Sequence, residues 1–348
     1  MSTPDVSRRD FFRWLAAGLG VLGGSWFLRA CGLETPRTPV PPRPTGTPEP
    51  TMVPPTAVPT QPTGEPTYTP VPTAPPTATP LPIPDLAVAR GGEPADLVRR
   101  AVAALGGMER FVRPGDDVIV KPNICVAYHS YEYAATTNPW VVGELVRMCR
   151  EAGAGRVRVM DSPFGGTAEQ AYAVTGIGEQ VEAAGGEMEI MSSFKFVPAD
   201  MSMALDLRNC DIYEDVLNAD VVITVPIAKH HNLARLTLGM KNLMGVIRDR
   251  PAIHRNIGQR LADLAARIRP ALAVVDAVRI LTANGPTGGN LADVQQLDTV
   301  IASPDIVAAD AFAGTLFGLQ SDALDYVRAG AAMGLGRMDL ENLIIGEV

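Results

Sequence analysis

The sequence has few cysteines, only a short apolar run near its N-terminus and no excess of positive charge. Its four cysteines include no Cys-x-x-Cys pair and no Cys/His pair at zinc-finger spacing, which argues against a zinc-finger protein. The apolar stretch at residues 14–28 has 15 residues, whereas a membrane-spanning helix needs about 20. The net charge of -8 at pH 7 argues against a nucleic-acid partner.

The N-terminal segment has the pattern of an export signal. Arg8 and Arg9 precede an apolar pair and a further basic residue, and the apolar stretch at 14–28 follows. A short apolar core behind a positive N-terminus is typical of a signal peptide. The paired arginines resemble the twin-arginine translocation signal, so we expect the twin-arginine export machinery as a partner and a location at the extracytoplasmic face of the cytoplasmic membrane, in the cell envelope. The alternative is an uncleaved N-terminal membrane anchor.

Residues 28–32, Leu-Arg-Ala-Cys-Gly, resemble a bacterial lipobox, in which the cysteine is lipidated and becomes the first mature residue. Cys31 is therefore the predicted lipidation site, at the end of a signal peptide over residues 1–31. Arg29 departs from the motif, and the alternative is ordinary signal cleavage nearby, with no role for Cys31. The other three cysteines allow either one disulfide and one thiol or three buried thiols.

Residues 32–84 are a predicted disordered linker rich in proline and threonine. Of the 31 prolines, 19 lie between residues 35 and 84, together with 13 threonines. Such a composition cannot bury a core, and proline favours the extended polyproline II conformation. We expect a semi-rigid stalk between the membrane and a globular domain.

Residues 85–348 alternate between strand and helix patterns. Strong strand patterns lie at 117–120, 156–160, 220–225, 271–275 and 298–302, and weaker ones at 187–191 and 204–207. Helix patterns lie at 139–152, 257–268 and 305–316. Continuous apolar strands that alternate with helices predict a single α/β domain with a mostly parallel sheet and helices on both faces.

Polar residues follow the carboxyl ends of these predicted strands. They are Lys121 and Asn123, Asp161 and Ser162, residues 229–231, and Asp276. Ligands of open α/β sheets bind at that edge, so the sequence predicts a site there. A carboxylate at the end of an apolar strand, such as Asp276, is costly unless it is paired or functional.

A basic segment at residues 229–255 lies within this acidic domain. It holds six Lys/Arg against one acid, and three of the four histidines. One interpretation is a pocket in which Lys229, Lys241 and Arg248, with Lys121, hold a phosphate or carboxylate. The other is a solvated basic face. Gly285 and Gly288 lie in a Gly-Pro-Thr-Gly-Gly segment that fits either a phosphate-binding loop or an ordinary tight turn.

The histidines leave two kinds of chemistry open. His230, His231 and His254, with Asp161 or Asp276, are candidate ligands of a divalent metal, and Asp161, His231, His254 and Asp276 are candidates for acid–base work. Adjacent histidines on an extended chain point to opposite sides, so at most one of His230 and His231 faces a given site. The identity of any cofactor stays open.

Several motifs together resemble the domain-of-unknown-function 362 family. They are Val-Lys-Pro-Asn at 120–123, Lys-His-His at 229–231, Thr-Leu-Gly-Met-Lys-Asn-Leu-Met-Gly at 237–245, and Gly-Pro at 285–286. The resemblance covers roughly residues 88–340. It implies an α/β fold and a site near these motifs, which adds Asn242 to the binding candidates.

Two departures from the family limit what the resemblance implies. Many relatives are described as iron–sulfur proteins because they carry an added ferredoxin-like cysteine module, which this chain lacks, so no iron–sulfur cluster is expected. Family members tend to have Lys-x-His, which makes His231 the better match than His230. They also have Glu-Gly before the Gly-Pro, where this chain has residues 282–284, Thr-Ala-Asn, so that glutamate's role does not carry over.

The leading hypothesis is an exported, membrane-tethered domain that acts on or binds an anionic small molecule, with or without a metal. The alternatives are a non-catalytic, lipid-anchored solute-binding or sensor protein, and an envelope protein whose basic segment only forms salt bridges. Carboxylates with shifted pKa values beside a lysine would favour the enzyme, and a pocket of donors without an acid–base pair would favour the binding protein.

Overall fold

The computed structural model describes residues 82–348. The predicted signal peptide, the lipidation site Cys31 and nearly all of the predicted stalk lie outside the described residues. Among residues 82–348, no helix is long and apolar enough to cross a membrane. The three cysteines of this part, Cys125, Cys149 and Cys210, are free thiols, and the first two are buried.

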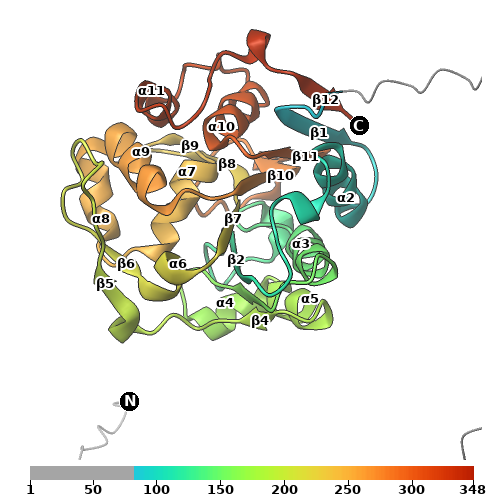
Figure 1. Ribbon diagram of the computed structural model, residues 1–348, viewed down its shortest axis with the longest axis horizontal. Coiled ribbons are helices and arrows are strands. Elements are labelled where there is room, and N and C mark those ends of the chain that lie inside the picture. Colours follow the sequence, from blue (N-terminus) through green and yellow to red (C-terminus); the bar gives the residue numbers. More distant parts are fainter. Residues whose placement is uncertain (1–81) are drawn as a thin grey trace, which may run out of the picture. The chain divides into compact units, whose positions relative to one another are not determined.

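A 10-stranded sheet organises the described chain (Figure 1). Its main path runs in the order β12-β1-β11-β10-β7-β2-β3-β4, and β8 and β9 pair beside β10. The bounds are β1 Leu86–Arg90, β2 Asp117–Pro122, β3 Arg156–Val159, β4 Glu187–Met188, β7 Val221–Val225, β8 Ile227–His231, β9 Arg235–Thr237, β10 Leu272–Leu281, β11 Val294–Ser303 and β12 Ile345–Glu347. A separate pair joins β5 (Phe196–Pro198) to β6 (Asp211–Tyr213).

The sheet is mostly parallel, and the structure confirms the predicted α/β fold. Strands β10, β7, β2, β3 and β4 pair in parallel along the main path, and β8 also pairs in parallel with β10. The antiparallel exceptions are β11, which pairs with both β1 and β10, and the β8–β9 hairpin.

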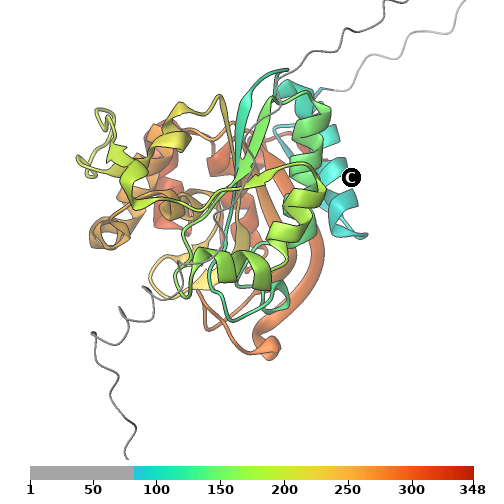
Figure 2. The ribbon, with the colours of Figure 1, turned by 90° about the horizontal axis from the view of Figure 1, so that it is seen from below.

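Helices cover both faces of the sheet, and the strands divide their side chains between two cores. In β2, Val118 and Val120 pack with α2 (Pro94–Ala104), α3 (Pro139–Glu151), α4 (Ala168–Val174) and α5 (Ile177–Ala183), while Ile119 packs into the opposite core. That core includes α7 (Gly239–Asn242), α9 (Ile257–Ile268), α10 (Ile306–Thr315) and α11 (Asp325–Ala332). Figure 2 shows the two helical layers on either side of the sheet. The period-two alternation of buried strands explains this division.

The short helix α7 is held in place by a carboxylate from another helix. It has no side-chain cap of its own, but Asp310 of α10 accepts hydrogen bonds from the backbone N–H groups of Gly239 (2.6 Å) and Met240 (2.9 Å). A carboxylate at a helix N-terminus satisfies donors that have no partner within the helix. The position of the segment that carries Lys241 and Asn242 therefore depends on Asp310.

Three expected boundaries differ in the structure. Strand β10 continues to Leu281 because it pairs with β11 along its whole length, so Asp276 lies inside the strand rather than after it. Residues 229–231 belong to β8 instead of a loop. Residues 204–207 form no strand, because Asp263 accepts hydrogen bonds from the N–H groups of Leu205, Asp206 and Leu207 in place of a neighbouring strand.

Candidate functional site

A cavity of about 350 Å³ lies beyond the carboxyl ends of β2 and β3, next to β8. Strand β2 is flanked by β3, the next parallel strand of the chain, and by β7, which comes much later, so the strand order reverses here. Ligands bind at such reversals in open α/β sheets. The cavity is lined by Asn123, Ile124, Cys125, Asp161, Ser162, Phe164, Lys229, His231, Thr237, Lys241, Asn242, Met244, Gly245, Arg250, Pro251, His254 and Pro286.

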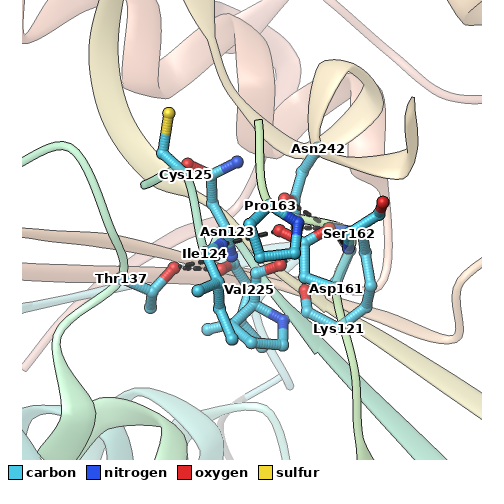
Figure 3. A network of polar contacts seen from close by, with 12 residues as sticks. Lys121, Asn123, Ile124, Cys125, Thr137, Asp161, Ser162, Pro163, Val225 and Asn242 are labelled. Atoms are coloured by element: carbon cyan, nitrogen blue, oxygen red, sulfur yellow. Dashed lines mark hydrogen bonds and ion pairs between the residues drawn. The ribbon is translucent and has the colours of Figure 1, made fainter. Parts of the chain in front are cut away.

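Lys121, Asp161 and Asn242 form a closed set of polar contacts that we call the rear network (Figure 3). The Lys121 Nζ donates to Asp161 Oδ1 (2.8 Å), Asn242 Oδ1 (3.0 Å) and the Pro122 carbonyl (2.7 Å), so all three of its donors are used. Asn242 donates through Nδ2 to the Lys121 carbonyl (2.8 Å) and to Thr224 Oγ1 (3.0 Å).

Asp161 also joins the loops that follow β2 and β3. Its Oδ2 accepts from the Ile124 N–H (2.6 Å) and its Oδ1 from the Ser162 N–H (2.9 Å), in addition to the Lys121 ammonium. Gly245 packs against this carboxylate so closely that a Cβ there would lie 1.7 Å from Asp161 Oδ1. The glycine that ends the 237–245 motif therefore lets the backbone approach the rear network.

Four side chains that line the cavity, Lys229, His231, Lys241 and Arg250, form what we call the front cluster. Lys229 and His231 are two residues apart on β8 and share one face of the strand. His230 does not line the cavity, and its Nδ1 accepts from the Gly285 N–H (3.1 Å). Lys241 comes from α7 and Arg250 from α8 (Arg250–Ile253).

The two lysines of the front cluster have no carboxylate partner in the described part of the chain. Lys229 is 1% exposed and donates to the carbonyls of Ala135 (2.6 Å) and Pro286 (2.9 Å). Lys241 is 9% exposed, and its Nζ makes one polar contact, with Met244 Sδ at 3.3 Å. Burial lowers the pKa of both amines, and with neighbouring positive charge it lowers the pKa of Lys241 to about 8.

His231 is a neutral hydrogen-bond donor in this cluster. Burial, with the charges of Lys241 and Lys229, lowers the pKa of His231 to about 3. Its Nδ1 accepts from the N–H groups of Leu233 (3.1 Å) and Ala234 (3.2 Å), so the hydrogen of the neutral ring lies on Nε2. His254 also lines the cavity, and burial lowers its pKa as well.

The cavity carries an excess of positive charge. Arg250 is anchored through Nη1 to the Ser162 carbonyl (2.9 Å) rather than to an acid. Among the lining residues, the only carboxylate is that of Asp161, which is already paired with Lys121. Lys229, Lys241 and Arg250 therefore face the cavity without a negative charge of their own.

The predicted site residues Arg248 and Asp276 lie away from the cavity. Arg248 is directed to the surface, where it pairs with Asp211 (3.0 Å) and donates to the Phe196 carbonyl (2.8 Å). Asp276 is fully buried in β10 and accepts from the N–H groups of Asn138 (2.7 Å) and Val278 (3.0 Å). Burial raises the pKa of Asp276 to about 7.

The structure does not bring the suggested metal ligands together. Asp276 lines a different, small pocket, away from the cavity that His231 and His254 share. Within residues 82–348, no group of three or more His, Cys, Asp and Glu side chains is arranged to hold a metal ion.

The glycines of the 285–289 loop are engaged within the protein. The Gly285 N–H donates to His230 Nδ1 (3.1 Å) and the Gly288 N–H to the Asn284 carbonyl (3.2 Å), so neither is available to cradle a phosphate. The loop instead directs the Pro286 carbonyl to Lys229, and it is this residue that lines the cavity.

Cys125 also lines the cavity, although no sequence pattern pointed to it. Thr237 and Arg250 line it too; they lay within the 237–245 motif and the basic segment but were not named as site candidates. One compositional signal was available. The chain contains 30 Lys/Arg, of which only four are lysines. Lys229 and Lys241 line the cavity. Lys121 is buried too, but it does not line the cavity and bonds to Asp161 and Asn242 of the lining. The fourth, Lys195, pairs with Glu189 and Asp215 near the surface.

The chain belongs to the family described as Domain of unknown function (DUF362), whose family model matches residues 118–315. It is 28% identical over 228 residues to a thylakoid-associated protein of Synechocystis sp., and the match covers 61% of this chain and 66% of the relative.

Two solved structures are also similar. The lactate racemase apoprotein from Thermoanaerobacterium thermosaccharolyticum is 12% identical, with 74% of this chain and 59% of that chain covered and a TM-score of 0.38. A protein from Thermotoga maritima is 13% identical, with 66% and 60% covered and a TM-score of 0.36. The chain thus spans less than two thirds of these proteins.

Proposed function

We propose that the cavity binds a small organic anion. The observation that carries this proposal is that Lys229 and Lys241 are buried at one cavity without a carboxylate partner in the described residues. An ammonium group that is buried without a counter-charge is unfavourable, and a bound anion would supply that charge. Structural salt bridges alone do not account for these two lysines.

The size of the cavity and its donors limit the class of anion. Its volume of about 350 Å³ lies at the small end of the range for ligand pockets, roughly 300–1,000 Å³. The donors are the ammonium groups of Lys229 and Lys241, the Arg250 guanidinium and the Nε2–H of His231. Carboxylates and phosphates are the groups that such donors recognise.

A binding function without catalysis is the second candidate, and the rear network favours it. Asp161 accepts three hydrogen bonds, including that of Lys121, so the only carboxylate at the cavity has its main acceptor sites occupied. The carboxylate half of the expected acid–base pair is thus engaged in holding the loops. Catalysis would have to come from another group.

We further propose that the protein acts outside the cytoplasm, tethered to the membrane. The support is the twin-arginine pattern, the lipobox-like segment at Cys31 and the stalk composition. The name of the thylakoid-associated relative is in keeping with a membrane location. Fractionation of cells that express the full chain tests this. The protein should be found with membranes and should be released by Cys31→Ser; an unchanged distribution in that variant would contradict lipid anchoring.

Calorimetric titration of the full chain with pyruvate, succinate and inorganic phosphate tests the anion site. Lys229→Gln removes the charge but keeps N–H donors for the Ala135 and Pro286 carbonyls, so we expect a loss of affinity of at least roughly tenfold. Lys195→Gln is the matched control, because this lysine pairs with surface acids. Equal affinities in the two variants, or no binding of any of the three anions, would contradict the proposal.

A further inference from the structure

The use of lysine in this chain separates two kinds of positive charge. Only four of the 30 Lys/Arg are lysines, so arginine supplies nearly all the positive charge. Arginine stays protonated in proteins, whereas a buried lysine changes its protonation state readily. Lys229 and Lys241 line one cavity, and Lys121 is bonded to Asp161 and Asn242 of the same lining, so three of the four lysines lie together where a ligand would bind.

Only one of these three amines lacks a strong hydrogen bond. Lys121 uses all three donors in the rear network, and Lys229 donates to two carbonyl oxygens. The Lys241 Nζ contacts only the Met244 thioether sulfur, at 3.3 Å, and lines the cavity. A thioether is a weak acceptor. Lys241 is therefore the amine that a ligand can reach without breaking an ion pair or a carbonyl hydrogen bond.

The surroundings of Lys241 also favour its neutral form. Burial has the largest effect on its pKa, and the charges of Lys229, Arg250 and Lys121 lower the pKa further, while Cys125 opposes them. With a pKa of about 8, roughly a tenth of the Lys241 side chains are neutral amine at pH 7. Burial and neighbouring cations are the two devices that activate nucleophilic lysines.

We propose that Lys241 forms an imine with the carbonyl group of the bound anion, so that the ligand class of this site is small oxo acids. The proposal rests on the proposed anion binding. The amine lone pair attacks the carbonyl carbon and a carbon–nitrogen bond forms. The carbonyl oxygen then leaves as water together with both amine hydrogens, so no oxidant or other reactant is needed. Lys229 and Arg250 hold the carboxylate, and the His231 Nε2–H lines the same cavity as a donor to the carbonyl oxygen.

Reductive trapping of the full chain with pyruvate and cyanoborohydride tests the imine. Peptide mapping by mass spectrometry should place a single carboxyethyl group on Lys241 of the unmodified sequence, which requires no variant that could misfold. We expect labelling of Lys241 to exceed that of Lys195 by about a hundredfold or more, because ion pairs with Asp215 and Glu189 hold the pKa of Lys195 above its usual value. Lys241→Arg should remove the label, and Lys195→Arg should not.

Methyl pyruvate is the matched control ligand, since it has the same carbonyl group but no negative charge. Trapping on Lys241 should be at least roughly tenfold slower with the ester, in line with the loss of a charge-assisted contact. Labelling of Lys195 or the N-terminus at the rate of Lys241, or equal rates with the ester, would overturn the imine. If pyruvate binds in calorimetry but is never trapped, the imine is wrong and the anion site stands. If pyruvate neither binds nor is trapped, the proposed binding of oxo acids is wrong. The succinate and phosphate titrations then decide whether the anion site is wrong as well.

Discussion

The rear network and the front cluster use the same residue type in opposite ways. Lys121 and Lys229 are each 1% exposed. Lys121 has an aspartate partner at 2.8 Å and an asparagine at 3.0 Å. In the described chain, Lys229 has no carboxylate partner and donates to two carbonyl oxygens, and Lys241 contacts a thioether. Burial of the side chain alone thus does not distinguish a lysine in an ion pair from one without a carboxylate partner; the distinction lies in the partners.

This difference follows from what each region connects. The rear network joins the ends of β2 and β3 to α7, and Gly245 allows its close packing. The side chains of the front cluster come from β8, from α8 and from α7, which Asp310 holds in place, and their charged groups line the cavity. Replacing the lysine of the rear network by a neutral residue should therefore lower the free energy of unfolding. Replacing a lysine of the front cluster should raise it, because like charges are then no longer buried together.

The largest change in the free energy of unfolding is expected from Lys121→Met. This change leaves Asp161 buried without its cation, and breaking a buried ion pair in this way costs about 3–5 kcal/mol. Urea denaturation should show that loss in the free energy of unfolding. A change below about 1 kcal/mol would remove the distinction between the two regions.

Lys241→Met is expected to change the free energy of unfolding in the opposite direction and to stabilise the protein. The folded state holds Lys241 at a pKa of about 8 against 10.5 for the free side chain, which corresponds to a penalty on the order of 3 kcal/mol at pH 7. The folded pKa lies below the unfolded one, so this penalty is full below pH 8 and disappears as the pH rises to about 10.5. Denaturation at pH 7 should show a more stable variant, and the gain should shrink toward pH 10. A destabilised variant at pH 7 would contradict this reading of Lys241.

A smaller change in folding stability is expected from the protonation of His231 below pH 6.5. Its folded pKa of about 3 lies below the value of 6.5 for a free histidine, so the unfolded chain binds a proton that the folded chain does not, and stability falls as the pH drops from 6.5 toward 3. At pH 5 the difference is on the order of 2 kcal/mol. His231→Gln should lose less stability between pH 7 and pH 5 than the wild type does. Parallel pH profiles would show that His231 is not held neutral.

The smallest effect is expected from Arg248→Ala. Its ion pair with Asp211 is about half exposed, and such pairs contribute about 0–1 kcal/mol. Its side chain points away from the cavity, so anion affinity should not change. Arg250→Ala, two residues along, should weaken anion binding in the same calorimetric assay. Equal loss of affinity in both variants would place the anion outside the front cluster.

Much of the fold was predictable because it depends on local patterns. The apolar runs of β2, β3 and β7 and the amphipathic helix α9 were predicted within a few residues of their observed bounds. The full length of β10 was not, because it depends on pairing with the distant strands β11 and β8. The β8–β9 hairpin was not predicted either, although it joins neighbouring residues. Asp276 was misplaced for that reason, since its strand continues through it.

The candidate site was predictable in part. The polar residues after predicted strands included Asn123, Asp161, Lys229 and His231, and the basic segment included Lys241; all five line one cavity. The sequence could not show that Arg248 points outward while Arg250 points inward, because this depends on the turn before α8, where Asp249 caps the helix through the Ala252 N–H. Nor could it show which lysine has an acid as its partner, since Lys121 and Asp161 meet across 40 residues of chain.

The most direct test compares the unfolding free energy of the wild type and Lys241→Met with and without pyruvate, with Lys195→Gln as the control. An anion present at about a hundredfold its dissociation constant should stabilise the wild type and the control by about 2.7 kcal/mol. We predict that Lys241→Met is more stable than the wild type without the anion and gains little from it. An equal gain in all three proteins would contradict the claim that the unpaired lysines of the front cluster form the anion site.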